Sequence, residues 1–404
     1  MKAGWQRKKL TDVCEFFNGL WKGEIPPFVQ VGVIRNTNFA KDGSLDDSDI
    51  AYLDVEAKKF EKRKLKRGDV ILEKSGGGPK QPVGRVALFE LETGNYSFSN
   101  FTSAIRVSDP RSLDFRYLHK FLYSFYLFGR TETMQSNSIG IRNLNGDAYK
   151  AIEIEYPKIA EQKRIVAILD EAFDGIATAK ANAEKNLQNA RDIFEKQLIS
   201  VFKLRGSGWL EKTIGDVCER VEYGTSAKSK PEGAIPVLRM GNIQGGRFVW
   251  DDLVYTDDDA EIEKYSLRFN DVLFNRTNSP ALVGKTAIYK GEMPAIFAGY
   301  LIRLHRKENL VDADYLNYFL NSEIAREYGK TMIISSVNQA NINGQKLKSY
   351  PIPIPPLKTQ QVIVKQLTAL SEETQRLESL YQQKLAALVE LKKSLLHEAF
   401  SGRL

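Results

Sequence analysis

The feature of this sequence that most constrains its fold is an internal duplication that runs through its length. Segments of the first half recur in the second half in the same order, and their spacing drifts only slightly along the chain. The matched pairs include Gly4–Glu15 with Gly208–Glu219, Leu65–Leu72 with Leu267–Phe274, Val83–Leu88 with Val283–Ile288, Tyr117–Ser124 with Tyr315–Ser322, and Asn143–Gly146 with Asn341–Gly344. Such a repeat predicts two copies of one structural unit in tandem.

Each copy ends in a segment with the pattern of a long helix. YPKIAEQKRIVAILDE (Tyr156–Glu171) and IPPLKTQQVIVKQLTA (Ile354–Ala369) both run from proline through an aliphatic residue to glutamine, and then into apolar residues at helical spacing. The apolar steps of three and four continue for about five heptads in each segment, which is typical of a coiled coil. We therefore predict that the two helices pair with each other in antiparallel orientation.

The remainder of each copy mixes β-rich runs, such as DVILEK and VGRVALF, with turns and short helical patterns. The predicted fold is α+β, with two tandem α/β units and two long antiparallel coiled-coil helices. The predicted boundaries are 1–157 for the first unit, 158–204 for the central helical region, 205–355 for the second unit and 356–404 for the C-terminal helical region.

Motifs that resemble nucleotide sites are weak in this sequence. SPALVGKT (Ser279–Thr286) ends like a phosphate-binding loop, but serine stands where that motif needs glycine, and the matching VGRVAL has no Lys-Ser/Thr pair. We interpret it as a strand entered from a loop. SGGGPKQP (Ser75–Pro82) is rich in glycine but lacks the glycine order of a dinucleotide-binding turn and is not followed by a helical pattern.

Catalytic and metal-binding residue types are scarce. With three histidines, His119, His305 and His397, general-base chemistry has few candidates. Cys14 and Cys218 occupy matched positions in the two copies of DVCE, which favours core packing over nucleophilic use. No spacing of these residues suggests a metal site.

Composition points to a protein of the reducing cytoplasm, with no membrane segment. No apolar run approaches the ~18 residues of a membrane span, MKAGWQRKKL lacks the apolar core of a signal peptide, and two scattered cysteines suggest free thiols. The net charge of +7 is compatible with a polyanionic partner without identifying one.

The two copies agree in framework positions and differ in polar loops. EKSGGGPKQP stands opposite NRTNSPAL, QSNSIGIRN opposite ISSVNQAN, and FFNGLWKGE opposite RVEYGTSAKSKPEG. Arg, Asn and Gln in such loops can form paired hydrogen bonds to base edges. The basic run KKFEKRKLKR (Lys58–Arg67) could contact phosphates, which need charge but no fixed geometry. Ordinary loop drift and a solvated charged face are the alternatives.

Taken together, the matched segments resemble the specificity subunit of a type I restriction–modification system. The resemblance rests on GWQRKKLTDVCE and GWLEKTIGDVCE, RGDVILEKSGGGPKQPVGRVALF and FNDVLFNRTNSPALVGKTAIY, RNLNG and NINGQKL, the two helix starts, and the closing LKKSLLHEAFSGRL. It implies two DNA target-recognition domains alternating with two long helices, on a subunit that is not itself a catalyst. Lys358–Gln360 departs from its counterpart Ala160–Gln162, so the two partner contacts need not be identical.

The resemblance also implies partners and cofactors. Such a subunit reads an asymmetric bipartite site on double-stranded DNA and holds two methyltransferase subunits, which join it to two restriction subunits. S-adenosylmethionine would bind the methyltransferases, and ATP and Mg the restriction subunits, so this chain would carry no cofactor and no metal. A self-sufficient nucleotide-dependent enzyme and a structural coiled-coil adaptor are the alternatives.

The loops that would carry recognition supply the candidate DNA-binding residues. The candidates are Lys22, Arg35, Asn36, Asn38, Lys74, Lys80, Gln81, Asn137, Arg142, Lys228, Lys230, Arg239, Asn242, Arg276, Asn278, Asn338 and Gln339. Arg35 and Asn38 recur in the second copy as Arg239 and Asn242, so these four could belong to the framework and not to base readout.

Overall fold

The computed structural model describes residues 4–20, 22–78, 81–138, 141–203, 206–336 and 339–404. They form two compact units: unit 1 comprises Met1–Ala183 with Gln383–Leu404, and unit 2 comprises Glu184–Gln382. Each unit therefore holds one copy of the repeat and about one half of each long helix. Within the described ranges, no helix combines the length and the hydrophobicity that crossing a bilayer needs.

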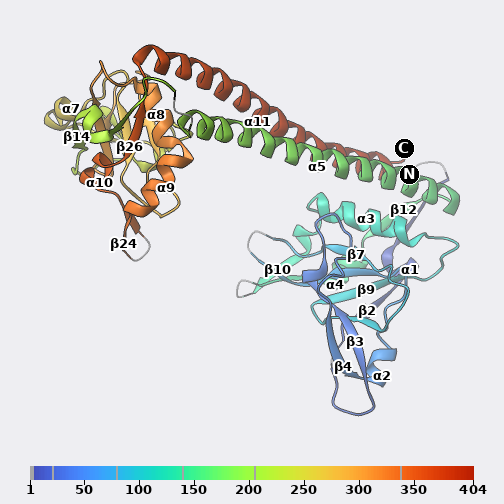
Figure 1. The fold of residues 1–404 in the computed structure, drawn as a ribbon. Coiled ribbons are helices and arrows are strands. Elements are labelled where there is room, and N and C mark those ends of the chain that lie inside the picture. Colours follow the sequence, from blue (N-terminus) through green and yellow to red (C-terminus); the bar gives the residue numbers. More distant parts are fainter. Residues whose placement is uncertain (1–3, 21, 79–80, 139–140, 204–205, 337–338) are drawn as a thin grey trace. The chain divides into compact units, whose positions relative to one another are not determined.

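Unit 1 mixes short strands with helices (Figure 1). Its strands are β1 (Gln6–Lys9), β2 (Cys14–Asn18), β3 (Phe28–Ile34), β4 (Ala51–Glu56), β5 (Val70–Glu73), β6 (Ser75–Gly77), β7 (Val86–Leu88), β8 (Tyr96–Phe98), β9 (Thr102–Val107), β10 (Gln135–Ser138), β11 (Ile141–Leu144) and β12 (Glu153–Tyr156). Its helices are α1 (Leu10–Val13), α2 (Ala57–Glu61), α3 (Phe115–Leu127) and α4 (Gly146–Lys150), with 3-10 turns η1 (Asn36–Asn38) and η2 (Glu132–Met134).

Unit 2 follows the same order with two differences: the short strand pair β16 and β17 is added after η3, and helix α9 stands in place of η2. Its strands are β13 (Leu210–Thr213), β14 (Cys218–Tyr223), β15 (Ile235–Leu238), β16 (Ile243–Gln244), β17 (Arg247–Phe248), β18 (Val254–Thr256), β19 (Val272–Asn275), β20 (Thr277–Asn278), β21 (Thr286–Ile288), β22 (Ile296–Phe297), β23 (Leu301–Arg306), β24 (Ile334–Ser336), β25 (Gln339–Asn341) and β26 (Pro351–Ile354). Its helices are α6 (Ile214–Val217), α7 (Asp259–Tyr265), α8 (Ala313–Asn321), α9 (Glu323–Met332) and α10 (Gly344–Lys348), with 3-10 turn η3 (Met240–Asn242).

The centre of each unit is a four-stranded antiparallel sheet. Its strand order is β2-β9-β5-β7 in unit 1 and β14-β23-β19-β21 in unit 2. β5 and β19 are fully buried runs of apolar residues that end in one polar residue. Helix α3 packs on β5 and β7, and α8 packs on β19 and β21. The side chains of Asp114 and Asp312 cap these helices by accepting hydrogen bonds from the first backbone N–H groups.

Two smaller sheets flank each central sheet. In unit 1 they have the orders β4-β3-β8 and β10-β11-β6, and in unit 2 the orders β18-β15-β22 and β20-β25-β24. The first and last strands of each unit also pair, β1 with β12 and β13 with β26, immediately before a long helix begins. Each unit therefore closes on itself at the residue where its helix starts.

The long helices are α5 (Ile159–Lys203) and α11 (Leu357–Phe400). In unit 1 the start of α5 lies beside the end of α11, because Ile165 and Leu169 share a buried cluster with Leu396 and Ala399. In unit 2 the end of α5 lies beside the start of α11, where Leu198 and Phe202 share a buried cluster with Ile363 and Leu367. The helices thus run antiparallel within each unit, and the predicted fold class is confirmed.

Candidate nucleic-acid interface

One cation stands at the same place in both units. Lys74 follows central strand β5, and Arg276 follows the matching strand β19. Lys74 Nζ lies 3.4 Å from Asn18 Oδ1, whereas the guanidinium carbon of Arg276 lies 4.8 Å from the centre of the Tyr223 ring. Burial lowers the pKa of Lys74 below its usual value. The two positions are equivalent in the fold, but the cationic residue and the side chain that contacts it both differ between the units.

The sheet registers show that Asn18 and Tyr223 are equivalent positions. Asn18 and Leu72 both pair with Ser103, and Tyr223 and Phe274 both pair with Ile302. Asn18 ends β2 and Tyr223 ends β14, so each faces the end of a central strand. The two pairs, Lys74 with Asn18 and Arg276 with Tyr223, therefore present different chemistry from the same position of the fold.

Asn38 and Asn242, which the sequence offers for either framework or readout, belong to the framework. Asn38 is 2% exposed, and its amide accepts from Arg35 N (2.9 Å) and donates to the carbonyls of Asp46 and Asp49. Asn242 is 3% exposed and bonds in the same way to Arg239 N and to two backbone carbonyls. Their oxygens and both amide hydrogens are already used, so they hold loops and do not face solvent.

Arg35 and Arg239 are also tied to the loops that follow them. Arg35 donates to the Asp49 carbonyl at 3.2 Å, and Arg239 donates to the Asp252 carbonyl at 2.6 Å. Each guanidinium also approaches the carboxylate of that aspartate. These contacts fix the loop next to η1 and η3 while leaving both side chains partly exposed.

Loops that the sequence places far apart meet in a small sheet in each unit. In unit 1, Ser75 of β6 donates to Asn143 Oδ1 of β11 at 2.6 Å, and Arg142 donates to Gln135 Oε1 at 3.5 Å. The predicted recognition loops at 74–81 and 137–143 are therefore partly strands of one sheet. In unit 2, Arg276 donates to Asn341 Oδ1 of β25 at 3.3 Å, so the cation borders the corresponding sheet.

Gly76, in strand β6, approaches the amide of Asn36 closely. Gly76 has φ +103°, a conformation that L side chains rarely adopt, and a Cβ there would come within 2.8 Å of Asn36 Nδ2. Asn36 Nδ2 donates to Glu73 Oε1 at 3.5 Å, a long hydrogen bond. Arg85 holds the same glutamate through two hydrogen bonds of 2.8 and 2.7 Å. Any side chain at this position would therefore press on the half-buried Asn36 amide.

The other candidates lie on the surface of their units or outside the described residues. Lys22, Gln81, Lys228, Lys230 and Gln339 are exposed, Asn278 is half-buried, and Lys80 and Asn338 lie outside the described residues. Asn137 lies in β10. Lys230 forms an ion pair of 3.0 Å with Asp257, and Asn278 Oδ1 accepts from Ser279 N at 2.8 Å.

The basic run of unit 1 is solvent-facing. Lys58, Lys62, Lys64, Lys66 and Arg67 are exposed on and after α2. Arg63 of the same run donates to the Asn18 carbonyl at 3.2 Å. The middle of the run therefore lies beside the Lys74–Asn18 pair. Lys59 and Arg67 form ion pairs with Glu56 and Glu92, and the run as a whole offers exposed positive charge for phosphate contacts, which need charge but no fixed geometry.

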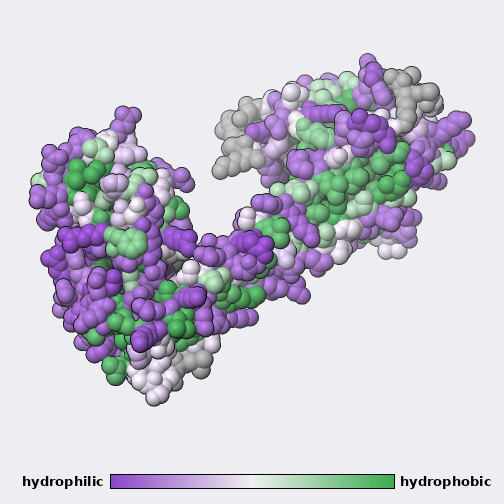
Figure 2. All heavy atoms as spheres, turned by 90° about the horizontal axis from the view of Figure 1, so that it is seen from above, coloured by the Kyte–Doolittle hydropathy of each residue, from purple (hydrophilic) through white to green (hydrophobic). Residues whose placement is uncertain are grey.

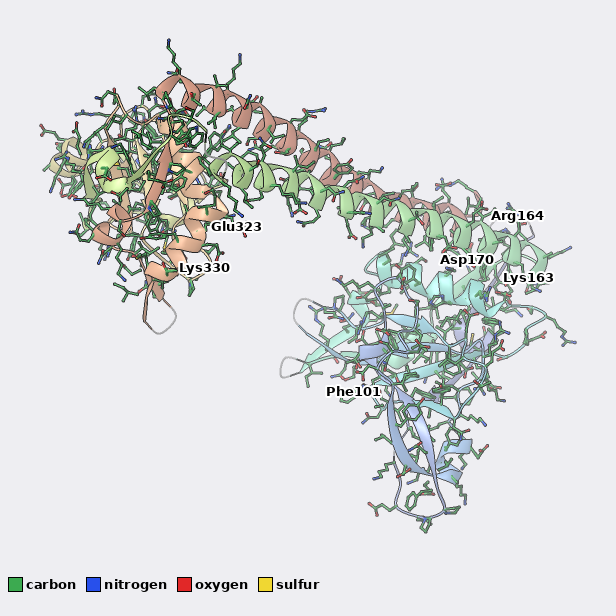
Figure 3. The ribbon with its side chains drawn as sticks, viewed as in Figure 1. Phe101, Lys163, Arg164, Asp170, Glu323 and Lys330 are labelled. Atoms are coloured by element: carbon green, nitrogen blue, oxygen red, sulfur yellow. The ribbon has the colours of Figure 1, made fainter. Side chains whose placement is uncertain are left out.

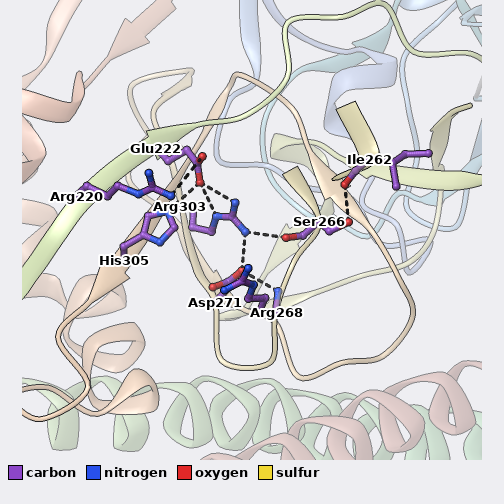
Figure 4. Close-up of polar contacts among 8 residues, drawn as sticks. All are labelled: Arg220, Glu222, Ile262, Ser266, Arg268, Asp271, Arg303 and His305. Atoms are coloured by element: carbon purple, nitrogen blue, oxygen red, sulfur yellow. Dashed lines mark hydrogen bonds and ion pairs between the residues drawn. The ribbon is translucent and has the colours of Figure 1, made fainter. Parts of the chain in front are cut away.

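Sequence reasoning missed a partly buried charge cluster in unit 2 (Figure 4). Arg303 donates to Asp271 at 3.0 Å and to Glu222 at 2.7 Å, and His305 Nε2 lies 2.8 Å from Glu222 Oε2. Burial alone would raise the pKa of Glu222, but the bonds from His305 and Arg303 outweigh it and lower that pKa. The duplicated aspartate was visible as a framework position; the residues that neutralise it were not.

The structure shows the surroundings of the VGKT stretch and of the two cysteines. The VGKT stretch leads into strand β21 and not into a helix, as predicted, so it lacks the helix N-terminus of a phosphate-binding loop. Burial raises the pKa of the Cys14 and Cys218 thiols to about 12, which favours the protonated form of both. Among the described residues, no group of three or more His, Cys, Asp or Glu side chains could hold a metal.

Comparison with known proteins assigns the chain to a family. The model of the type I restriction modification DNA specificity domain matches residues 2–188 and 206–386. The type I restriction enzyme StySPI specificity subunit of Salmonella potsdam is 26% identical, over 100% of this chain and 90% of that protein. The EcoKI specificity subunit of Escherichia coli K12 is 24% identical, over 95% and 83%.

Solved structures share the fold. A chain from a structure of the type I restriction–modification system, on its complex assembly and conformational transition, aligns with a TM-score of 0.79 at 18% identity and covers 100% of this chain and 99% of its own. The HsdS subunit of Thermoanaerobacter tengcongensis aligns with a TM-score of 0.62 at 17% identity over 100% and 98%. The resemblance drawn from the sequence is confirmed: the chain belongs to the family of type I restriction–modification DNA specificity proteins.

Proposed function

We propose that this specificity subunit reads an asymmetric, bipartite sequence on double-stranded DNA, one half-site with each unit. The observation that carries the proposal is that equivalent positions of the two units hold different side-chain pairs. These pairs are Lys74 with Asn18 in unit 1 and Arg276 with Tyr223 in unit 2. An arginine can bind guanine through two hydrogen bonds, whereas a lysine is a mobile point charge. Two units with the same backbone fold but different side chains at this equivalent position are expected to recognise two different half-sites.

The chain would work without chemistry of its own. We propose that it holds two methyltransferase subunits, which use S-adenosylmethionine, and through them two restriction subunits, which use ATP and Mg. Neither buried thiol is poised as a nucleophile, and VGKT does not form a phosphate-binding loop, so a self-sufficient nucleotide-dependent enzyme is not favoured. Because the proposed target is DNA, we propose that the protein acts in the cytoplasm.

The long helices offer a surface for the protein partners. Hydrophobic side chains lie at the surface among the hydrophilic ones (Figure 2). On α11, Val362, Leu380, Val389 and Leu391 are each about half exposed, although the outer face of this helix is otherwise polar. Apolar residues that remain exposed on a coiled coil favour contact with another protein over contact with DNA, whose backbone is charged.

Substitution of the two matched cations tests the proposal. In the complex with its partner subunits, Arg276→Ala should cost about 1–3 kcal/mol of binding to the cognate site and relax one base position in the half-site of unit 2. Lys74→Ala should act on the half-site of unit 1 only. Binding measurements on randomised duplexes and sequencing of methylated sites would report both effects.

The basic run provides the matched comparison. Lys62→Ala with Lys64→Ala should weaken binding to cognate and random duplexes alike and flatten the dependence of affinity on salt. Arg376→Ala, which removes an exposed cation from α11, should leave site choice unchanged. If Arg276→Ala and the double lysine variant weakened all sequences equally, readout by the matched cations would be refuted.

A further inference from the structure

An exposed aromatic ring stands beside the matched cation in both units. Phe101, between β8 and β9, is 45% exposed, and Tyr300, immediately before β23, is 48% exposed. The Phe101 carbonyl accepts a hydrogen bond from Lys74 N, and the Tyr300 carbonyl accepts one from Arg276 N, both at 3.0 Å. A single exposed aromatic ring is ordinary on a protein surface. Here both units expose a ring at the equivalent position, hydrogen-bonded through its backbone to the candidate DNA-contacting cation, which points to a common role.

In unit 1 this ring forms one wall of a hollow of about 350 Å³. Phe101 lies near the base of the β3–β4 hairpin (Figure 3). The apolar part of the lining includes Leu20, Val33, Leu53 and Val55, and Lys22, Asn36 and Asn100 are among its polar members. Two of these polar members, Lys22 and Asn36, are residues that the sequence already offered for DNA contact.

The residues that line the hollow indicate which part of a DNA duplex it can contact. Two cations, Lys22 and Arg35, also line the hollow and can approach the DNA backbone. The ring and the aliphatic side chains, however, offer nothing that a phosphate uses. Leu53 is 46% exposed and Phe101 45%, so the hollow is open on this side. A pocket for an extruded base instead stacks side chains on both faces of that base. A base edge in a duplex groove fits a shallow site, and thymine is the base whose groove edge carries a methyl group.

We infer that Phe101 makes the apolar contact to the C5 methyl group of a thymine in the half-site read by unit 1; the inference rests on the proposed function. The amides of Asn36 and Asn100 line the same hollow. Asparagine amides bind the groove edge of adenine. Unit 1 therefore recognises an A·T pair, with the ring on the thymine methyl and an amide at the neighbouring adenine edge.

Replacement of each thymine in the bound site by deoxyuridine, which lacks the methyl group, tests the inference. The complex of the full chain with its partner subunits binds the intact site and the substituted duplexes in parallel. One position in the half-site of unit 1 should weaken binding roughly fourfold, the value of one buried methyl group. Phe101→Ala should bind the intact and the substituted duplex with equal affinity, which identifies the ring that the methyl group touches.

Matched variants keep the outcome interpretable. Phe28→Ala removes another half-exposed ring from β3, outside the named lining, and should keep the wild-type deoxyuridine profile. Tyr300→Ala should also keep that profile in the half-site of unit 1. Thermal unfolding separates a folding defect of Phe101→Ala from a lost contact, and Phe101→Leu, which retains apolar bulk, should retain part of the methyl effect.

The two levels of the argument fail differently. If the wild-type complex bound no sequence preferentially, the proposed function would be wrong. If it bound a specific site but that half-site contained no thymine, or no deoxyuridine substitution mattered, or the methyl effect persisted in Phe101→Ala, the inference alone would be overturned.

Discussion

Among single residues, the two units neutralise one buried carboxylate in different ways. In unit 1, Arg106 binds Asp69 through two hydrogen bonds of 2.7 Å. The sheet register places His305, not arginine, at the position that matches Arg106, and the arginine of unit 2 enters two residues earlier as Arg303. From its shifted position, Arg303 also binds Glu222. The equivalent aspartates Asp69 and Asp271 therefore have different charged neighbours in the two units.

We predict that Glu222→Gln destabilises unit 2 by about 1–3 kcal/mol near neutral pH, because hydrogen bonds to charged groups are lost. The folded-state pKa of Glu222 lies below its ordinary value of 4.5. Its contribution is therefore fully present above about pH 4.5 and is lost as the pH falls toward the lowered value. Urea unfolding of both proteins between pH 7 and pH 4 should show the difference in stability shrinking at the acid end.

The control for this pH dependence is Glu308→Gln. Glu308 is exposed and pairs with Arg306 at the surface, so its loss should change stability little at any pH. A difference between wild type and Glu222→Gln that stayed constant down to pH 4 would show that the charge of Glu222 is not what stabilises the cluster.

Recurrence in both copies marks residues that the frame of each unit uses, although the sequence also offered Asn38 and Asn242 for DNA binding. Asp69 and Asp271, like Asn38 and Asn242, recur because backbone loops need the same hydrogen bonds in both units. The arginines that pair with the aspartates could not be predicted, because strands come together only in three dimensions and a shift of two positions keeps a side chain on the same face of a strand.

Among elements, the repeated glutamine explains why each long helix starts where it does. Gln162 is fully buried; its oxygen accepts from Asp114 N, and its nitrogen donates to the carbonyls of Ser112 and Pro157, all at 2.8 Å. Gln360 makes the three equivalent bonds in unit 2. One side chain thus ties the helix start to the cap of α3 or α8.

We predict that Gln162→Leu destabilises unit 1 by about 2–4 kcal/mol, because three buried backbone groups lose their partner. Gln188→Leu on the exposed face of the same helix, where the amide donates to Asp192, is the matched control and should cost less than about 0.5 kcal/mol. Equal stability of both variants in chemical unfolding would contradict an anchoring role for the buried glutamine.

The predictability of elements follows the range of their interactions. The helices were predictable because their apolar period is local, and α5 begins two residues after the proline at 157. The stretches expected as free recognition loops proved to be partly strands, β6 with β10 and β11 in unit 1. Such pairing joins segments far apart in the chain, and short polar strands carry no alternation of apolar and polar residues to reveal them.

For the whole molecule, α5 carries the chain from unit 1 into unit 2 without a break. We predict a longer DNA site when one heptad is added to α5 near Ala183 and one to α11 near Gln382. The part that lengthens is the spacer, the stretch of unspecified sequence between the two half-sites. A heptad keeps the apolar seam in register and adds roughly 10 Å of rise, or about three base pairs. The half-site sequences should stay unchanged.

A two-residue insertion at the same places is the control for the heptads. It rotates the seam by about 200° and should impair assembly. Mapping of methylated sites would report the spacer for every variant that remains active. An active heptad variant with the original spacer would show that helix length does not set the distance between half-sites.

The most direct test of the central claim, that each unit reads its own half-site, is an exchange of units. Residues 1–156 would be replaced by the matching segment of a relative with a different recognition sequence, and methylated sites would be mapped genome-wide in a host that carries the partner subunits. The account predicts that one half of the bipartite sequence changes to that of the relative while the other half and the spacer stay as they are. A change in both halves would contradict it.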